Sequence, residues 1–157
     1  MSDQPDTPAT EAVAAAGIDH RLVAYGRVSS AAEAAEARGV PLEALAKTLV
    51  VRVEEGSYVL VCVPGPDRLD YAALRELLGV RRLTMPDPDE AKTATGYARG
   101  TITPFGAGGW PVVVDESLAG LDEVSLGAGA TGWALHVSGP DLVAATGATV
   151  AAIAERD

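Results

Sequence analysis

The fold is decided by residues 48–63, which read TLVVRVEEGSYVLVCV. Two apolar, β-branched runs, Thr48 to Val53 and Tyr58 to Val63, flank the polar residues 54–57. Runs of this composition favour strands, and a short polar segment with a glycine between them favours a reversal of the chain. We therefore predict an antiparallel hairpin with a four-residue turn, placed centrally in a sheet.

Outside this hairpin, capping and periodicity predict several short elements without a regular βαβ alternation. This pattern predicts an α+β domain with a mixed, mainly antiparallel sheet flanked by helices. Helices are expected at Thr10 to Ala16, Ser30 to Gly39, Pro41 to Ala46, Asp70 to Leu78, Asp87 to Gly96 and from about Pro140, and strands at Arg21 to Tyr25, Pro111 to Asp115, Leu121 to Leu126 and Gly132 to Val137.

The length of 157 residues fits one domain, with 48% hydrophobic and 22% charged residues as in ordinary globular proteins. Residues 1–9 are polar, acidic and proline-containing, so we expect a mobile tail there and a single domain over 10–157. No apolar run approaches the roughly 20 residues of a membrane span. We expect a cytoplasmic protein without a membrane partner.

The formal net charge is −10, which argues against a protein that coats nucleic acid non-specifically. A local basic face is still compatible with this charge. Arginines cluster in one part of the chain, and either a phosphate-binding patch or a solvated helix face explains them. They are Arg68, Arg75, Arg81 and Arg82, followed by Lys92 and Arg99.

Lys47 is one of only two lysines and borders the apolar run of the first predicted strand. A lysine at the edge of a core loses hydration, so its pKa falls unless an anion lies nearby, and such lysines recur at sites for anionic or ester substrates. The alternative is a lysine whose ammonium reaches the surface beside a strand end.

Residues 96–106 form a loop with glycines at positions 96, 100 and 106. Glycines let backbone N–H groups approach a ligand, so this loop could hold a carbonyl, a phosphate or an attacking water. A plain turn-forming role is the alternative. The segment from Asp122 to Gly132, with Ser125 and Gly127, forms a second loop of this kind.

Histidine and cysteine chemistry is not indicated. The two histidines, His20 and His136, lie far apart in sequence and have no nearby third ligand, so we assign neither a catalytic role and expect no metal. The single cysteine, Cys62, lies in an apolar run and is predicted to be a buried core thiol.

A series of short motifs resembles the YbaK/prolyl-tRNA editing family. The resemblance extends over about residues 12 to 150. The motifs follow in the family's order as Lys47-Thr48-Leu49, Val63-Pro64, Met85-Pro86-Asp87-Pro88, Thr95-Gly96-Tyr97, Gly100 to Gly106 with its GxxxP pattern, and Val114-Asp115-Glu116.

The resemblance implies a partly barrel-like sheet and an aminoacyl-tRNA deacylase that hydrolyses the ester of a mischarged tRNA, with Cys-tRNA(Pro) or Ala-tRNA(Pro) as the expected substrate. It implies Lys47 and Gly100 as catalytic residues and no cofactor. The tRNA acceptor end is the implied partner, with prolyl-tRNA synthetase as a further candidate. The implied substrate-binding residues are Tyr25, Thr48, Thr95, Gly96, Thr101, Ile102, Thr103, Pro104, Ser125 and Gly127.

One departure concerns Ala134, which stands where many relatives place an acidic residue after the second glycine loop. Substrate specificity depends on pocket shape and a few polar contacts, so this change bears on the identity of the amino acid. Ser125 and Asp115 could be pocket-wall residues or structural ones.

A non-catalytic aminoacyl-tRNA or synthetase-binding module, or a regulator that binds a small ligand or nucleotide, stays open as an alternative.

Overall fold

The computed structural model describes residues 4–155. The predicted hairpin is confirmed as β2 (Ala46–Glu54) and β3 (Ser57–Pro64). Its turn is tighter than predicted, because Glu54 pairs with Ser57 and only two residues connect the strands. The second of them, Gly56, has a φ of 75°, a value that L side chains rarely adopt.

The hairpin belongs to a four-stranded sheet with the order β2-β3-β5-β8. The other two strands, β5 (Val112–Asp115) and β8 (Thr149–Ala151), join it in parallel. A second sheet has the order β1-β7-β6 and is antiparallel throughout. Its strands are β1 (Arg21–Ala24), β7 (Trp133–Val137) and β6 (Val124–Gly127).

A two-stranded antiparallel pair, β4 (Arg68–Leu69) and β9 (Ala154–Glu155), completes the sheets. Antiparallel pairings therefore outnumber parallel ones, four to two, and the predicted α+β class is confirmed. The strands within residues 4–155 form no closed barrel. The two larger sheets touch at one parallel bridge between Leu45 and Ser125, just before β2.

The helices begin at polar caps and mostly end at glycines, as the sequence predicts. Ser30 accepts a hydrogen bond from the Glu33 N–H, but the Glu33 carboxylate bonds to Ser29 instead of closing a capping box on Ser30. The helices are α1 (Pro8–Ala16), α2 (Ala31–Arg38), the 3₁₀ turn η1 (Leu42–Ala44), α3 (Tyr71–Leu78), α4 (Pro88–Thr95), α5 (Glu116–Ala119) and α6 (Gly139–Thr146).

The N-terminal boundary of the fold lies earlier than predicted. Thr7 caps α1, and its hydroxyl donates a 2.7 Å hydrogen bond to the carbonyl of Ala128. Ala9 is fully buried. The predicted tail of residues 1–9 is therefore too long, since residues 7–9 belong to the folded domain. Residues 1–3 of that tail, and residues 156–157 of the predicted domain, lie outside the described residues.

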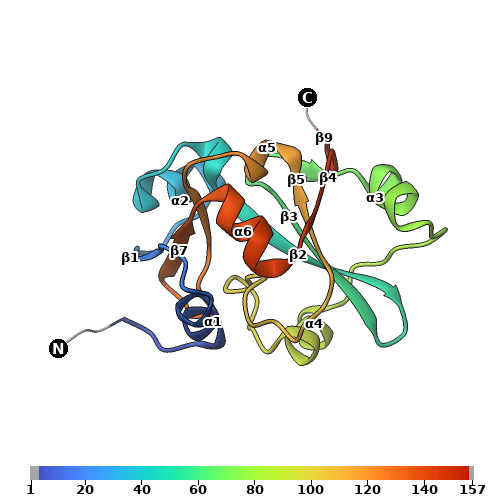
Figure 1. Ribbon diagram of the computed structural model, residues 1–157, viewed down its shortest axis with the longest axis horizontal. Helices are drawn as coiled ribbons and strands as arrows, with labels where there is room; N and C mark the ends of the chain where they lie inside the picture. Colours follow the sequence, from blue (N-terminus) through green and yellow to red (C-terminus); the bar gives the residue numbers. More distant parts are fainter. Residues whose placement is uncertain (1–3, 156–157) are drawn as a thin grey trace.

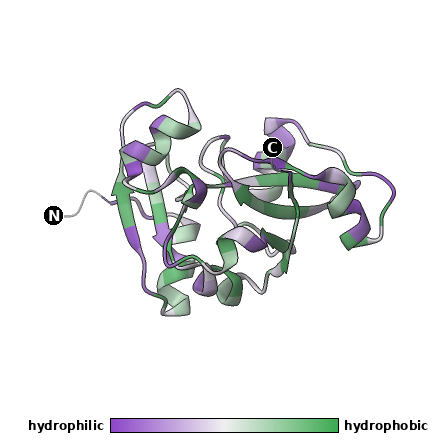
Figure 2. Ribbon diagram, turned by 90° about the horizontal axis from the view of Figure 1, so that it is seen from above, coloured by the Kyte–Doolittle hydropathy of each residue, from purple (hydrophilic) through white to green (hydrophobic). Residues whose placement is uncertain are grey.

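The four-stranded sheet is covered on both faces. Alternate residues of β3 enter different cores: Leu60 and Cys62 pack toward α1 and α6, whereas Val59 and Val61 pack toward α3. Figure 1 shows α6 lying across one face of the sheet and α3 at the far end of the molecule. In Figure 2 the central strands are coloured mainly as hydrophobic. Burial of both faces explains why β3 is continuously apolar.

Cys62 lies in the middle of this sheet and is fully buried, as predicted. Burial raises the pKa of its thiol to about 12. We expect iodoacetamide to leave the native protein unmodified at pH 8 and to label Cys62 fully in urea, because only the thiolate is nucleophilic. Intact-protein mass spectrometry measures this, and full labelling without urea would contradict the burial.

His136 lies in β7 with a fully buried ring, and its Nδ1 is 3.4 Å from Oε1 of Glu123. Burial lowers the pKa of His136, and the charges of Arg21 and Arg38 act in the same direction, while Glu123 opposes them. The unfolded chain therefore binds this proton more readily than the folded chain. The contribution of His136 to stability is present above its ordinary pKa of 6.5 and is lost progressively as the pH falls from that value through the lowered pKa of the folded state.

We expect His136→Gln to lose less stability than the wild type between pH 7.5 and 5.5, measured as the free energy of unfolding in urea. His20→Gln is the control, because His20 is the other histidine and lies exposed in the segment before β1. Equal pH dependence of the wild type and His136→Gln would show that His136 is not the titrating group.

Candidate functional site

A cavity of about 560 Å³ opens beside the start of β2. Its wall combines the first residues of β2 with the end of α2, the segment before α4 and both glycine loops. The lining residues are Arg38, Leu45, Ala46, Lys47, Thr48, Leu49, Val50, Met85, Pro86, Pro88, Ala91, Arg99, Gly100, Ile102 and Gly127. The size is that of a small-molecule site.

The structure brings five predicted site residues together at this wall. Lys47, Thr48, Gly100, Ile102 and Gly127 all line the cavity, although they come from three separated stretches of the chain. The two glycine loops are thus neighbours in space, as a shared site requires. This juxtaposition is the structural basis for treating the cavity as the candidate site.

Lys47 is half-buried in the second position of β2. Loss of hydration lowers the pKa of Lys47, the charge of Asp67 opposes this shift, and Arg68 adds to it. The salt bridges within residues 4–155 do not include this ammonium. Its neighbour Thr48 places its hydroxyl 3.6 Å from Sγ of Cys62. The intermediate burial places Lys47 at the edge of the core, and its role in a substrate site stays a prediction.

The second glycine loop supports the first by close backbone contact. A Cβ at Gly127 would lie 2.6 Å from the carbonyl oxygen of Ile102 and 2.8 Å from that of Thr101, distances that real Cβ atoms essentially never show. Gly100 has open space around it but a φ of 87°. Glycine is therefore required at position 127 for packing and at position 100 for backbone conformation.

Several residues predicted to bind substrate instead hold the loop in place. The Thr95 hydroxyl donates to the carbonyl of Ala91 and accepts from the Tyr97 N–H, at the point where Gly96 ends α4 with a φ of 82°. The Thr101 hydroxyl donates to the carbonyl of Ala98. These side chains are satisfied by local backbone groups, so they shape the loop and do not line the cavity.

Thr103 and Pro104 are also buried away from the cavity wall. The Thr103 hydroxyl has no hydrogen-bond partner among the described residues. The side chains of Thr95, Thr101, Thr103 and Pro104 are thus buried outside the cavity wall, and the exposed Gly96 does not line the cavity either. Their role in substrate binding, which the resemblance assigns to backbone groups for residues 100–104, stays a prediction.

Tyr25 and Ser125 do not line the cavity themselves, but both contact Arg38, which does. The guanidinium donates 3.1 Å from Nη2 to the Tyr25 hydroxyl and 3.3 Å from Nη1 to the Ser125 hydroxyl. It also lies over the Tyr25 ring, 4.5 Å from the centroid. Arg38 was not predicted to be a site residue, because in the sequence it is only the last residue of a helix before Gly39. No sequence signal distinguishes it from the other arginines.

Other candidates from the sequence lie elsewhere. Asp115 is buried in β5 and accepts hydrogen bonds from Ser117 and from the backbone N–H groups of Ile153 and Ala154, which ties the C-terminal strand to the sheet. Ala134 is fully buried in β7 and does not line the cavity. Asp115 is thus structural, and the Ala134 departure falls in a buried strand.

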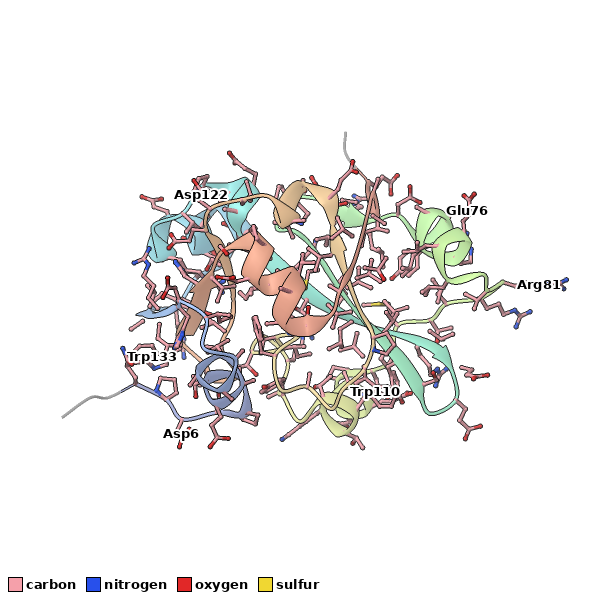
Figure 3. The ribbon with its side chains drawn as sticks, in the orientation of Figure 1. Asp6, Glu76, Arg81, Trp110, Asp122 and Trp133 are labelled. Carbon is pink, nitrogen blue, oxygen red and sulfur yellow. The ribbon has the colours of Figure 1, made fainter. Side chains whose placement is uncertain are left out.

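Of the predicted basic cluster, only Arg99 lines the cavity. Arg81, at the tip after α3, points away from the body of the molecule in Figure 3. Arg68 and Arg82 are also exposed. Arg99 is therefore the one member of this cluster among the lining residues, and Arg68 acts on the site only through its charge on Lys47.

Residues 4–155 contain no group of three or more histidine, cysteine or acidic side chains placed to hold a metal ion. Within the same residues, no helix is both long and apolar enough to cross a membrane.

The fold agrees with the comparisons to known proteins. The chain belongs to the aminoacyl-tRNA editing domain family, whose pattern matches residues 26–145. The resemblance inferred from the sequence motifs is thereby confirmed.

Several relatives are proline–tRNA ligases. The ligase of Acidithiobacillus ferrooxidans is 32% identical over 130 residues, and that of Shouchella clausii is 31% identical over 108 residues. These alignments cover 82% and 69% of this chain but only 22% and 19% of the ligases, so the chain spans about a fifth of their length.

Relatives of similar size also exist. YwhH of Bacillus subtilis, an uncharacterized protein, is 31% identical over 111 residues, which are 70% of each chain. A crystal structure described as that of "a putative trans-editing enzyme for prolyl tRNA synthetase" is 30% identical, with a TM-score of 0.86 over 98% of this chain and 100% of the other. The α+β architecture is thus that of an editing domain.

Proposed function

We propose that this protein is a trans-editing deacylase, which hydrolyses the ester between a wrong amino acid and the 3′ end of a tRNA. The observation that carries the proposal is the cavity in which Lys47, Gly100 and Gly127 meet, within the region that matches the editing family. Because the relatives include proline–tRNA ligases, we propose tRNA(Pro) carrying alanine or cysteine as the substrate.

The residues that line the cavity suit ester hydrolysis by a positioned water. They include no carboxylate, histidine or cysteine, so neither a general base nor a nucleophile comes from these side-chain types. Lys47 and backbone N–H groups of the Gly100 loop would stabilise the negative charge that develops on the carbonyl oxygen of the ester as water adds to the carbonyl carbon. The ribose oxygen then leaves with a proton, and a neighbouring ribose hydroxyl of the substrate would assist the proton transfer.

The tRNA acceptor end is the proposed partner, with prolyl-tRNA synthetase as a second one. A net charge of −10 disfavours broad contact with the tRNA backbone, so the protein would touch the acceptor end alone or gain affinity from the synthetase. The predicted cytoplasmic location stays a prediction.

The test is deacylation of tRNA(Pro) charged in turn with alanine, cysteine and proline. We expect the wild-type protein to release alanine or cysteine and to leave Pro-tRNA(Pro) intact, since discrimination rests on the fit of the aminoacyl group. Acid-gel or thin-layer detection of the labelled tRNA measures the rate. Equal spontaneous loss with and without protein for all three esters would reject tRNA(Pro) editing.

A further inference from the structure

The candidate cavity is electropositive in a strongly acidic protein. Three of its lining residues are cations, namely Arg38, Lys47 and Arg99, and none is aspartate or glutamate. The whole chain has a formal net charge of −10. Like charges gathered around one half-open cavity repel each other, and a low-dielectric wall strengthens this repulsion. Such a cavity favours an anionic occupant.

Arg38 is the best-oriented of the three cations. Its two terminal nitrogens donate hydrogen bonds to the hydroxyls of Tyr25 and Ser125, and the guanidinium lies over the Tyr25 ring in a cation–π contact. These partners are neutral, and Arg38 takes part in none of the salt bridges within residues 4–155. Its Nε is buried without a hydrogen-bond partner there. The positive charge is therefore held in place by neutral partners and forms no salt bridge with a carboxylate of residues 4–155.

The rest of the wall is apolar and suits a flat or hydrocarbon group beside the anion. Leu45, Leu49, Ile102 and Pro86 contribute to it, together with the exposed side chain of Met85. A cavity of about 560 Å³ is much larger than a lone inorganic anion. A nucleoside that carries a phosphate combines an apolar body with the required charge, and arginine suits phosphate because its planar fork can donate two hydrogen bonds.

We propose that Arg38 binds a phosphate group of a nucleotide held in this cavity, and that Tyr25 and Ser125 are positioning residues that act through Arg38. The inference rests on the proposed function where the nucleotide is the 3′ end of a tRNA. A free nucleotide presents the same group. The role of Arg38 is distinct from that of Lys47, because Arg38 comes from the end of α2 and is held by β6 and by the residue after β1.

The test compares ligands that differ by one phosphate. We expect the wild type to bind AMP at least about tenfold more tightly than adenosine in isothermal titration, and Arg38→Met to reduce that ratio to near one, since hydrogen bonds to charged groups carry an effect of this order. Arg38→Lys should keep part of the ratio. Arg27→Met is the matched control, because Arg27 is exposed and does not line the cavity.

The positioning role is tested with Tyr25→Phe and Ser125→Ala. We expect each to weaken AMP binding when Arg38 is present and to have no further effect in the Arg38→Met background, because both hydroxyls act on the guanidinium. Equal effects in both backgrounds would instead show a general structural role. Thermal melting checks that every variant folds. If Arg38→Met does not fold, the binding comparison is made with Arg38→Lys and Tyr25→Phe instead.

Binding of the trinucleotide CCA, the common 3′ end of tRNA, shows whether the bound phosphate belongs to a tRNA end or to a free nucleotide. Arg38-dependent binding of both CCA and AMP supports a tRNA end, and Arg38-dependent binding of AMP alone supports a free nucleotide. A wild type without preference for AMP, or an Arg38→Met variant that keeps it, overturns the proposal. Absence of deacylation with this binding intact would reject the proposed function and leave the role of Arg38 standing.

Discussion

Lys47→Met is expected to lower kcat/KM for the edited ester by about 100-fold or more, the usual effect of removing a donor that stabilises a developing oxyanion. Methionine keeps the length and apolar body of the side chain but removes the ammonium. The lysine lines the cavity and has no salt bridge within residues 4–155, so its charge is available to a substrate. Single-turnover deacylation of the edited tRNA measures the loss in the chemical step.

Lys92→Met is the matched control, since Lys92 is the only other lysine and is exposed on α4 outside the cavity wall. It should retain wild-type activity. The lowered pKa of Lys47 adds a second readout, because the ammonium form is lost at a lower pH than for an ordinary lysine. A Lys47→Met enzyme with an unchanged single-turnover rate would remove Lys47 from the mechanism.

Gly127→Ala is expected to destabilise the domain by about 2–3 kcal/mol and to reduce deacylation strongly, because an added Cβ must displace backbone that cannot rotate away. The atoms in its path are the carbonyl oxygens of Thr101 and Ile102, at 2.8 and 2.6 Å. Moving them shifts the loop that begins at Gly100 and with it one wall of the cavity. Urea unfolding and the deacylation rate measure the two effects.

Two further alanine variants separate stability from site geometry. Gly120→Ala meets no atom within 4 Å and should be nearly neutral. Gly139→Ala would place its Cβ 2.2 Å from the carbonyl oxygen of Leu118, between α5 and α6, so it should destabilise without changing the cavity wall directly. If Gly127→Ala and Gly139→Ala lost activity only in proportion to their stability, the geometric role of Gly127 would be rejected.

The sequence alone determined the local structure. The β-branched runs on either side of Gly56, the N-cap Asp87 with Pro88, and the glycine that ends α4 act through neighbours within a few residues, so their pattern is visible in the chain. The same holds for the position of Lys47, which borders the apolar run of its own strand. The order of short motifs added the family, which the comparisons confirm.

Only the tertiary structure decided which residues meet. The parallel pairing of β5 with β3 joins strands about 50 positions apart, and nothing local specifies it. Thr101 was predicted to bind substrate, and in the structure its hydroxyl and its backbone N–H both donate to the carbonyl of Ala98, an arrangement set by the loop backbone. Arg38 became a site residue only because packing brings the end of α2 beside Tyr25 and Ser125. Side-chain burial and partner choice depend on contacts distant in sequence, so short-range patterns do not determine them.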